Sequence, residues 1–532
     1  MTIKGIPREK IMADIKKRVE DLDASSRFDY TNDTHADTCS FCGAKDDYVR
    51  TTGHCILHTE KHDWFKTDDG VRIWDYARVK EFWRTIREEK IAKNDYDFTH
   101  VIFPKFADEN FWLSGASRVF RHDVSFVQAS FLDHALFFET VFAGRVMFHG
   151  CTVDGTADFR FAICKQQSDF GTIRFAGKLL FMNVTCEESC AFRNNKMFDE
   201  TDFSNTTFRK SVEWNGSRFL GKADFSLIKS MGKADFSDVQ FTHAAIFWLS
   251  RFEKADFSRV TFSSEQRTQF LQATFGKGAD FSHIVFPGTT VFRRTDLRYA
   301  SFKDSKIDKA LFSECTFNES LGRTALFDEV MLLKKRHNKP FAPEQTIKFL
   351  DKIRSRNISS EDFEEVEELD RQMKKNFEER RDYENAGDFH YGEMEMRRRK
   401  LRAEVFEVNT EEEPIARAVA HAFNWVTVYP GRRFLLFWYG VLAGYGERAE
   451  HTWLAIIAAL GVFTGLFWWT FGFHPNELLT ALSMAGENFI PLLSSLDAEH
   501  TNIMRRMIYD AETIVSTILW FLLLISVRRT FQ

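Results

Sequence analysis

The chain has 532 residues, of which 44% are hydrophobic and 28% are charged, so global disorder is excluded and two or more folding units are expected. Its formal net charge of -5 indicates neither a basic nucleic-acid-binding surface nor a strongly acidic one. The unusual feature is the 57 phenylalanines, because ordinary domains spread their large apolar residues over Leu, Ile and Val.

The first segment, residues 1–95, is expected to form an N-terminal lobe. It begins MTIKGIPREKIMADIKKRVEDLDA, which is charged and lacks the apolar stretch of a signal peptide. We therefore expect the N-terminus to stay in the cytoplasm and the eight cysteines of the chain to stay reduced.

Two closely spaced pairs of metal-binding residues stand in this lobe, namely Cys39 with Cys42 and Cys55 with His58. Thiolates and imidazole in two such pairs suit a four-coordinate zinc ion. The spacing predicts a structural zinc knuckle at 39–58 that caps the next domain; the alternative is reduced cysteines beside a histidine in a packed lobe. Nearby substitutes for His58 as a ligand are His35, His54 and His62.

Residues 96–318 carry large apolar residues at steps that alternate between five and six and later become steps of five. The alternating series runs through Phe126, Phe131, Phe137, Phe142, Phe148, Val153, Phe159, Cys164, Phe170, Phe175, Phe181, Cys186 and Phe192. Neither a helix nor a strand brings such a step to one face, so the backbone must turn a corner between successive apolar residues. A small residue often precedes the ring in strings that read A-D-F, beginning at Ala157, Ala223, Ala234, Ala255 and Ala279.

This pattern resembles the pentapeptide-repeat family, in which a small residue and a Leu or Phe point into a square, right-handed β-helix. The six-residue steps depart from the family pattern and imply bulged corners or a somewhat irregular coil, with side loops near Met197, Ile228 and Glu265. Some members of the family mimic DNA, but basic stretches such as RFRFAICKQQ oppose the continuous negative face that a mimic needs. No nucleic-acid partner is expected.

Residues 319–430 are rich in Glu, Lys and Arg and have helical spacing, as in Leu369, Met373 and Phe377. The pattern predicts a helical hairpin with its turn at 385–387, which resembles an insert of membrane-linked pentapeptide-repeat proteins. His390 and Glu393 have the spacing of a metal-binding pair, but a simple charged helix face is the favoured interpretation. We interpret the hairpin as the element that couples the solenoid to the membrane.

The last segment, 431–532, is predicted to be a membrane domain. The uncharged run at 452–473 is long enough to cross a hydrocarbon core of roughly 30 Å, and 508–527 is a second candidate span. The apolar run at 434–446 is too short to cross and is expected to lie in the membrane interface. Its headgroup anchors would be Trp438, Tyr439 and Tyr445.

The distribution of arginines predicts that both ends of the chain are cytoplasmic. Arginines outside the two spans on this side are Arg432, Arg433, Arg448, Arg528 and Arg529. Arg505 and Arg506 lie on the other side and weaken the prediction. The tail LLLISVRRTFQ resembles the ending of the membrane-linked family, which implies the inner or plasma membrane of a bacterium.

Between the spans, residues 474–507 have the order of a short helix and a descending loop, as in two-helix cation channels. The string A-G-E-N-F-I-P contains the pore candidates Glu487 and Asn488 but no potassium-filter motif. Glu487 would form a ring of carboxylates in an oligomer; the alternative is a solvated acidic residue in an external loop.

No phosphate loop, nucleophile elbow, HExxH motif or dinucleotide fingerprint is found in a plausible context, so an enzyme is not expected. The leading hypothesis is a membrane-anchored scaffold or sensor whose solenoid binds a macromolecular partner, with a protein favoured. The alternative is a channel-like membrane effector gated by the cytoplasmic solenoid. It would be a homo-oligomer, because one chain has too few spans to surround a pore.

Overall fold

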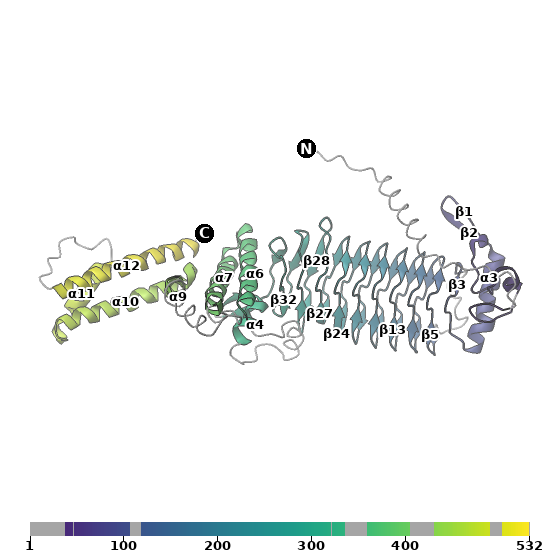
Figure 1. Ribbon diagram of the computed structural model, residues 1–532, viewed down its shortest axis with the longest axis horizontal. Coiled ribbons are helices and arrows are strands. Elements are labelled where there is room, and N and C mark those ends of the chain that lie inside the picture. Colours follow the sequence, from purple (N-terminus) through teal and green to yellow (C-terminus); the bar gives the residue numbers. More distant parts are fainter. Residues whose placement is uncertain are drawn as a thin grey trace, which may run out of the picture.

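The computed structural model describes residues 38–45, 47–106, 119–320, 322–335, 359–404, 430–489 and 503–530. The molecule is a long rod in which a small lobe, a β-solenoid, a helical block and a group of apolar helices follow one another along the long axis (Figure 1). This architecture confirms the predicted fold class of a β-solenoid followed by an α-helical region and two apolar C-terminal helices.

The solenoid has about nine turns of parallel strands. From Ser130 to Glu213 each turn has four short strands, one on each of four faces, and strands of neighbouring turns pair in parallel. After Phe241 one of the four faces carries only isolated bridges among the described residues. Thr152 pairs with Arg174 and Ala157 pairs with Leu179, so one turn takes 22 residues. Near the C-terminal end Phe292 pairs with Phe312 and the turn shortens to 20 residues.

The strands of each face follow in chain order. Face 1 contains β3 Ile102–Phe103, β6 Ser130–Phe131, β10 Thr152–Val153, β14 Arg174–Phe175, β18 Lys196–Met197, β22 Arg218–Phe219 and β25 Gln240–Phe241. Face 2 contains β7 Ala135–Leu136, β11 Ala157–Asp158, β15 Leu179–Leu180, β19 Thr201–Asp202, β23 Ala223–Asp224, β26 Ala245–Ile246, β28 Thr268–Leu271, β31 Thr290–Arg293 and β33 Leu311–Ser313.

The other two faces belong to one bent sheet. Face 3 contains β4 Val119–Phe120, β8 Val141–Phe142, β12 Ile163–Cys164, β16 Thr185–Cys186, β20 Thr207–Phe208 and β29 Thr274–Phe275. Face 4 contains β5 Val124–Ser125, β9 Val146–Met147, β13 Ser168–Asp169, β17 Cys190–Ala191, β21 Val212–Glu213, β30 Ala279–Asp280 and β32 Ala300–Ser301. Two longer strands, β24 Lys229–Asp235 and β27 Arg251–Asp256, run around the corner from face 3 to face 4.

The corners explain the alternating steps of five and six. From Gln128 to Leu249, a residue with positive φ recurs every eleven positions, and it is asparagine at Asn183, Asn194 and Asn205. Asparagine tolerates this left-handed conformation better than most residues. Where a corner contains such a residue, successive apolar side chains are five residues apart. The corners in between lack it and are one residue longer, so there the apolar side chains are six residues apart. The coil is therefore regular, and the extra residue sits at alternate corners.

The interior of the solenoid is filled by two parallel ladders of aromatic rings. One ladder is Phe126, Phe148, Phe170, Phe192, Trp214, Phe236, Phe257, Phe281 and Phe302. The other is Phe137, Phe159, Phe181, Phe203, Phe225, Phe247, Phe270, Phe292 and Phe312. Rings of one ladder meet the other edge to face, as Phe225 meets Phe236 with centroids 5.3 Å apart. Burial of each ring contributes about 1.5–3 kcal/mol, which is why the sequence repeats phenylalanine.

The three predicted side loops have different outcomes. Met197 lies in β18 and pairs in register with Phe175 and Phe219, so the prediction of a loop there is wrong. Methionine simply replaces a ring on the inside. Next to Ile228, β24 has a register shift between Ser230 and Lys233, which is a bulge, and Glu265 lies in an exposed bend between faces 1 and 2.

The N-terminal lobe covers the first turns of the solenoid. Its elements are α2 Asp47–Thr52, the 3-10 turn η1 His62–Trp64, β1 Phe65–Asp68, β2 Val71–Trp74, α3 Tyr76–Thr85, the π-helical turn η2 Ile86–Lys90 and the 3-10 turn η3 Ile91–Lys93. Phe82 of α3 packs edge to face on Phe103 of β3, with centroids 5.8 Å apart. On the side of the solenoid, Trp74 Nε1 donates a hydrogen bond to Asp133 Oδ2 at 3.2 Å.

A second block closes the other end of the solenoid. It consists of the hairpin β34 Asn318–Ser320 and β35 Arg323–Ala325, followed by α4 Phe327–Lys335, α6 Ser360–Glu379 and α7 Tyr383–Glu404. The predicted helical spacing is confirmed, since Leu369, Met373 and Phe377 are all buried in α6. Side chains of α6 also satisfy the open edge of the last turn: Gln372 Oε1 accepts from the backbone N–H of Ile307 at 2.7 Å.

The turn of the helical hairpin was predicted at 385–387, and this prediction is wrong. The turn lies at Arg380–Asp382, where Arg381 has a φ of 63° and Asp382 Oδ1 accepts from the backbone N–H of Asn385 at 3.3 Å. Gly387 lies inside α7, where a Cβ atom would come within 2.7 Å of Glu447 Oε2. The glycine therefore marks a close approach between helices.

The last group of elements contains the predicted membrane helices. They are α9 Pro430–Ala443, η4 Gly444–Gly446, α10 Ala449–Thr470, η5 Pro475–Glu477, α11 Leu478–Phe489 and α12 Ile503–Thr530. Two stretches, Ala449–Thr470 and Ile503–Arg528, are long and apolar enough to cross a bilayer. Both begin a few residues earlier than the predicted 452–473 and 508–527, because the helical backbone continues into the polar flanks.

Candidate functional site

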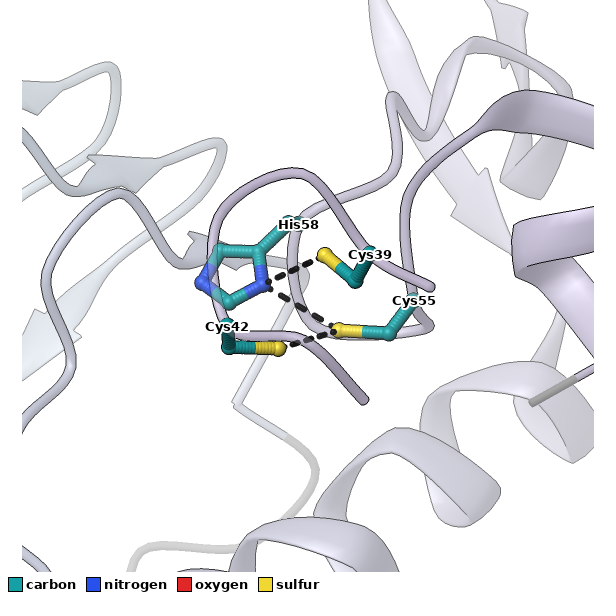
Figure 2. Close-up of side chains that lie close together, drawn as sticks. All are labelled: Cys39, Cys42, Cys55 and His58. Carbon is teal, nitrogen blue, oxygen red and sulfur yellow. Dashed lines mark hydrogen bonds between the residues drawn. The ribbon is translucent and has the colours of Figure 1, made fainter. Parts of the chain in front are cut away.

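The four predicted zinc ligands come from two tight turns on either side of α2. In the first turn, Gly43 donates its backbone N–H to the carbonyl of Cys39 at 2.8 Å. In the second, His58 donates its backbone N–H to the carbonyl of Cys55 at 3.0 Å. Each turn thus brings two side chains to the same place, and Figure 2 shows the four pointing toward one another.

The ligand atoms of Cys39, Cys42, Cys55 and His58 all lie within 4.8 Å of one another. His58 Nδ1 is 3.6 Å from Cys39 Sγ and 3.1 Å from Cys55 Sγ, and the Sγ atoms of Cys42 and Cys55 are 3.5 Å apart. Zinc bonds of about 2.3 Å to sulfur in a tetrahedron require sulfur atoms about 3.8 Å apart. The four atoms therefore have the spacing that a four-coordinate metal needs.

The protonation of the two close thiols is unequal. The hydrogen bond with Cys55 lowers the pKa of Cys42 to about 3, and the same bond raises the pKa of Cys55. The pair accordingly holds one proton between two sulfur atoms. A zinc ion binds ionised thiolates. The Cys42 thiolate would therefore bind the metal directly, and the proton on Cys55 would be displaced on binding.

His58 is oriented from its far side. Its Nε2 lies 3.2 Å from the carbonyl oxygen of Thr99, which makes Nε2 the donor and leaves Nδ1 free to bind a metal. Thr99 belongs to the beginning of the solenoid, where Phe98 is already part of the core. The metal cluster and the first turn of the solenoid are thus connected through one imidazole ring.

The three substitute histidines do not join the cluster where they can be placed. His54 Nδ1 hydrogen bonds to Ser40 Oγ at 2.9 Å, and His62 is exposed beside Glu60. His35 lies outside the described residues. The structure therefore selects the predicted set of four, and no other group of three or more metal-binding side chains is found in the part of the chain that the structure describes.

Lys61 is a residue of this lobe that the sequence analysis missed. Its side chain is fully buried, donates to the carbonyl of Thr59 at 2.9 Å and lies over the rings of Trp64 and Phe82 at 5.0 and 5.1 Å. Burial lowers its pKa to about 7. The motif K-H-D-W gives no signal of burial, because lysines in short polar segments are ordinarily solvated.

In the helical block, the His390 and Glu393 pair lies in an ion-pair network between α6 and α7. His390 Nδ1 is 3.0 Å from Lys374 Nζ and 3.5 Å from Glu393 Oε2, and Arg371 Nε donates to Glu393 Oε1 at 3.2 Å. Burial opposes ionisation of Glu393, but the hydrogen bond from His390 and the charge of Lys374 outweigh it and lower its pKa to about 2. These contacts give the pair a structural explanation as helix-to-helix links.

Contacts through α7 connect the end of the solenoid to the apolar helices. The ring of Tyr391 lies between two guanidinium groups, 5.0 Å from that of Arg323 in β35 and 5.4 Å from that of Arg448 at the start of α10. Tyr445 of η4 donates its hydroxyl to Glu395 Oε2 at 3.2 Å and is buried. The prediction that Tyr445 anchors the chain in the membrane interface is wrong, because its ring packs against Tyr391 and its hydroxyl bonds to Glu395, both in α7.

The pore candidates are partly placed. Glu487 lies exposed on α11, where Ser483 Oγ donates to its Oε1 at 3.4 Å. Asn488 lies in the same helix, but its side chain is outside the described residues, as are residues 490–502 of the predicted descending loop. Helix α11 buries Ala481 and Ala485 in one apolar cluster with Phe467 of α10 and Leu519 of α12.

Comparisons of the chain with protein-family models, with curated proteins and with solved structures return no match. The functional argument therefore depends on the site geometry described above.

Proposed function

We propose that this protein is a membrane-anchored scaffold whose solenoid binds a macromolecular partner, and we favour a protein as that partner. The observation that carries the proposal is the unbroken path of contacts from Arg323 through Tyr391 to Arg448, which ties the block that closes the solenoid to the helix that is long enough to cross a bilayer. A solenoid held in this way has its faces at a fixed orientation relative to the apolar helices. The chain carries out no catalysis in this proposal.

The solenoid is proposed to be of the pentapeptide-repeat type. Supporting observations are the four faces, the inward Ala and Phe of strings such as Ala223 to Phe225, and the shortening of the last turns to 20 residues, four units of five. The turns of 22 residues differ from that pattern only at their alternate corners.

The anchor is proposed to be the pair α10 and α12 in the inner or plasma membrane of a bacterium, with both chain ends in the cytoplasm and α9 in the interface. Exposed Phe434 and Trp438 on α9 support the last point. Carbonate extraction of membranes that contain the full chain, compared with the chain truncated after residue 429, tests the anchor. The full chain should stay in the pellet and the truncated chain should be released; release of both would contradict the proposal.

The cluster of Cys39, Cys42, Cys55 and His58 is proposed to bind a structural Zn²⁺, which would close the two turns of the lobe over the first turn of the solenoid. Metal analysis of the purified full chain should give one zinc per protein. Cys55→Ser should reduce the zinc content to background and increase proteolysis within residues 38–106, whereas Cys315→Ser, a change at a cysteine far from the cluster, should do neither. A zinc-free wild-type chain with an intact lobe would contradict the proposal.

A second candidate function is a channel-like effector, and the packing of α11 against both apolar helices favours it. It requires a homo-oligomer in which Glu487, or Asn488, lines the path of the ions. Cross-linked mass in detergent and planar-bilayer recording separate the two candidates. A monomer without conductance would contradict the channel and be consistent with the scaffold. A conductance that changes in Glu487→Gln would show that the spans form an ion path as well as an anchor.

A further inference from the structure

One small area of the solenoid exposes apolar side chains that the folding of the chain does not explain. We call it the β24–β27 patch, and it consists of Leu227, Lys229, Met231, Trp248, Leu249 and Arg251. Three of these side chains are well exposed: 38% for Leu227, 57% for Met231 and 42% for Trp248. Most large rings of the solenoid are turned inward, with Phe161 at an earlier corner as an exception, and here three exposed apolar side chains lie together.

The register of the strands makes the patch continuous. Leu227 donates its backbone N–H to the carbonyl of Trp248 at 2.7 Å, and Lys229 pairs with Arg251 on the next turn. Neighbouring turns lie about 4.8 Å apart, so the two apolar corners and the two basic residues form adjacent rows.

Backbone strain at the patch points to a use beyond folding. Leu227 and Leu249 occupy left-handed corners with φ of 58° and 52°. The same corner line carries Phe161, Asn183 and Asn205 in earlier turns, and asparagine adopts this conformation at lower cost than leucine or phenylalanine. A leucine in this place is strained and, at Leu227, gains little burial in return. Such strain persists in proteins mainly at functional positions.

The charge of the patch indicates the chemistry of its partner. Lys229 and Arg251 are exposed and make no ion pair with any residue that the structure describes. Glu253, two residues after Arg251 in the same strand, is paired with Lys277. Two free cations beside three exposed apolar side chains are complementary to a segment that carries carboxylates and bulky apolar residues.

The position on the rod argues against lipid as the occupant. Later turns of the solenoid and the helices α6 and α7 lie between the patch and the helices α10 and α12 (Figure 1). The patch therefore faces sideways, well away from the end that carries the candidate spans. Leucine and methionine side chains also do not suit a phosphate backbone, for which charge alone would suffice.

We propose that the β24–β27 patch is the docking surface of the solenoid for an acidic, apolar segment of a partner protein. This inference rests on the proposed scaffold function and adds to it the place of binding and the class of partner. Trp248 and Leu227 would bury the apolar residues of the segment, while Lys229 and Arg251 would pair with its carboxylates.

The test is a selection of short random peptides on the purified full chain in detergent. The peptides that are enriched should combine net negative charge with bulky apolar residues. Lys229→Glu with Arg251→Glu should weaken the best peptide by about tenfold or more, and Trp248→Ala by about fivefold. The matched control is Lys196→Glu with Arg218→Glu, a second in-register pair of exposed cations on face 1, which should change binding less than about twofold.

Each other result has a defined meaning. Peptides that bind the wild type but are insensitive to the patch variants, or are lost only in the face 1 control, would overturn the patch and leave the scaffold proposal standing. Failure to select any peptide would overturn the patch and remove support from the scaffold as well. Single-stranded RNA or vesicles containing phosphatidylserine, tested in parallel, should not bind; their patch-dependent binding in place of acidic peptides would also overturn the inference.

Discussion

The interior of the solenoid and the interior of the block at its C-terminal end are stabilised in opposite ways. In the solenoid, two ladders of rings stack at centroid distances near 5 Å. Some buried hydroxyls bond to the backbone, as Thr206 Oγ1 donates to the carbonyl of Phe181 at 2.6 Å, whereas Thr268 Oγ1 and Thr290 Oγ1 have no hydrogen-bond partner among the described residues. In the block, the core contains Arg323 and Glu329, whose side chains are fully buried as an ion pair. Asp370 is buried beside them, and neither of its carboxyl oxygens has a hydrogen-bond partner.

The two regions therefore obtain their stability from different interactions. Repeated apolar burial favours the solenoid turn by turn, with no single residue indispensable to the whole. A buried ion pair adds little net stability but is costly to break, so it fixes one geometry of the contact between the rod and α6 and α7. We call this contact the joint. Its buried charges determine its geometry, whereas the stability of the solenoid comes from many similar apolar contacts.

The largest expected effect comes from removing a ring. Phe225→Ala should destabilise its region by about 4 kcal/mol, because the ring is fully buried and stacks on Phe203 and Phe247. Hydrogen exchange of the amides in β23 and the strands paired with it measures the loss. The matched control is Phe161→Ala at an exposed corner, which should change stability by less than about 0.5 kcal/mol. Equal losses in both variants would show that the ladders are not the source of stability.

Breaking the buried ion pair should have the next largest effect. Arg323→Met leaves the buried Glu329 without its counter-charge and should destabilise the block by about 3 kcal/mol, seen as faster exchange in α6 and α7. Arg323→Met with Glu329→Met should recover most of the loss, because the pair is then replaced by apolar groups. Arg298→Met, which breaks an exposed pair with Asp296, is the control and should cost less than about 1 kcal/mol. If the double variant were as unstable as the single one, the role of charge in the joint would have to be reconsidered.

The joint should also respond to pH, with a sign opposite to that of an ordinary surface carboxylate. Burial, followed by the neighbouring charge of Glu329, raises the pKa of Asp370 well above its usual range. The folded state therefore keeps a proton that the unfolded chain releases above about pH 4, and stability falls as pH rises from there. The decline is at most about 1.4 kcal/mol per pH unit from this group.

Asp370→Asn should remove this contribution, so that the variant is more stable than the wild type at pH 8 and the difference shrinks toward pH 5. Exchange protection of α6 measured across this range checks the prediction. The raised pKa of Glu365, about 7 because of burial and Asp304, gives a decline of the same sign in both proteins and cancels in the comparison. A difference that grows toward low pH would contradict the assignment.

The same contrast explains how much the sequence revealed. The steps of five and six, the A-D-F strings and the apolar runs were sufficient for the solenoid and the two apolar helices, because a periodic core leaves a periodic trace. The pairs Cys39 with Cys42 and Cys55 with His58 also sufficed for the metal cluster, since the turns that join them are local. Arg323 and Asp370 gave no such trace: the contacts of Arg323 with α7 and the charged neighbours of Asp370 are distant in sequence, and single charged residues are normally solvated.

The turn of the helical hairpin was predicted at the wrong residues for a related reason. Asn385 and Gly387 have the composition of a turn, yet Gly387 lies inside α7, where the side chain of Glu447, in the turn after η4, comes close to it. Arg381 takes the left-handed conformation of the true turn without any glycine. Local propensity predicts local structure well, but a close contact between distant elements overrides it.

The smallest expected effect concerns the corner line of the solenoid and separates folding from binding. Leu227→Asn replaces a strained leucine by the residue that earlier corners use, and it should stabilise that turn by about 0.5–1 kcal/mol while weakening the binding of acidic peptides. The reciprocal change, Asn205→Leu, loses the hydrogen bond from Asn205 Nδ2 to Asn183 Oδ1 and should destabilise by about 1 kcal/mol. Because the two changes exchange the same residue types one turn apart, opposite signs would show that the leucine is kept at the expense of stability. Destabilisation by both would mean that Leu227 serves the fold, and the case for the β24–β27 patch would lose the strain that supports it.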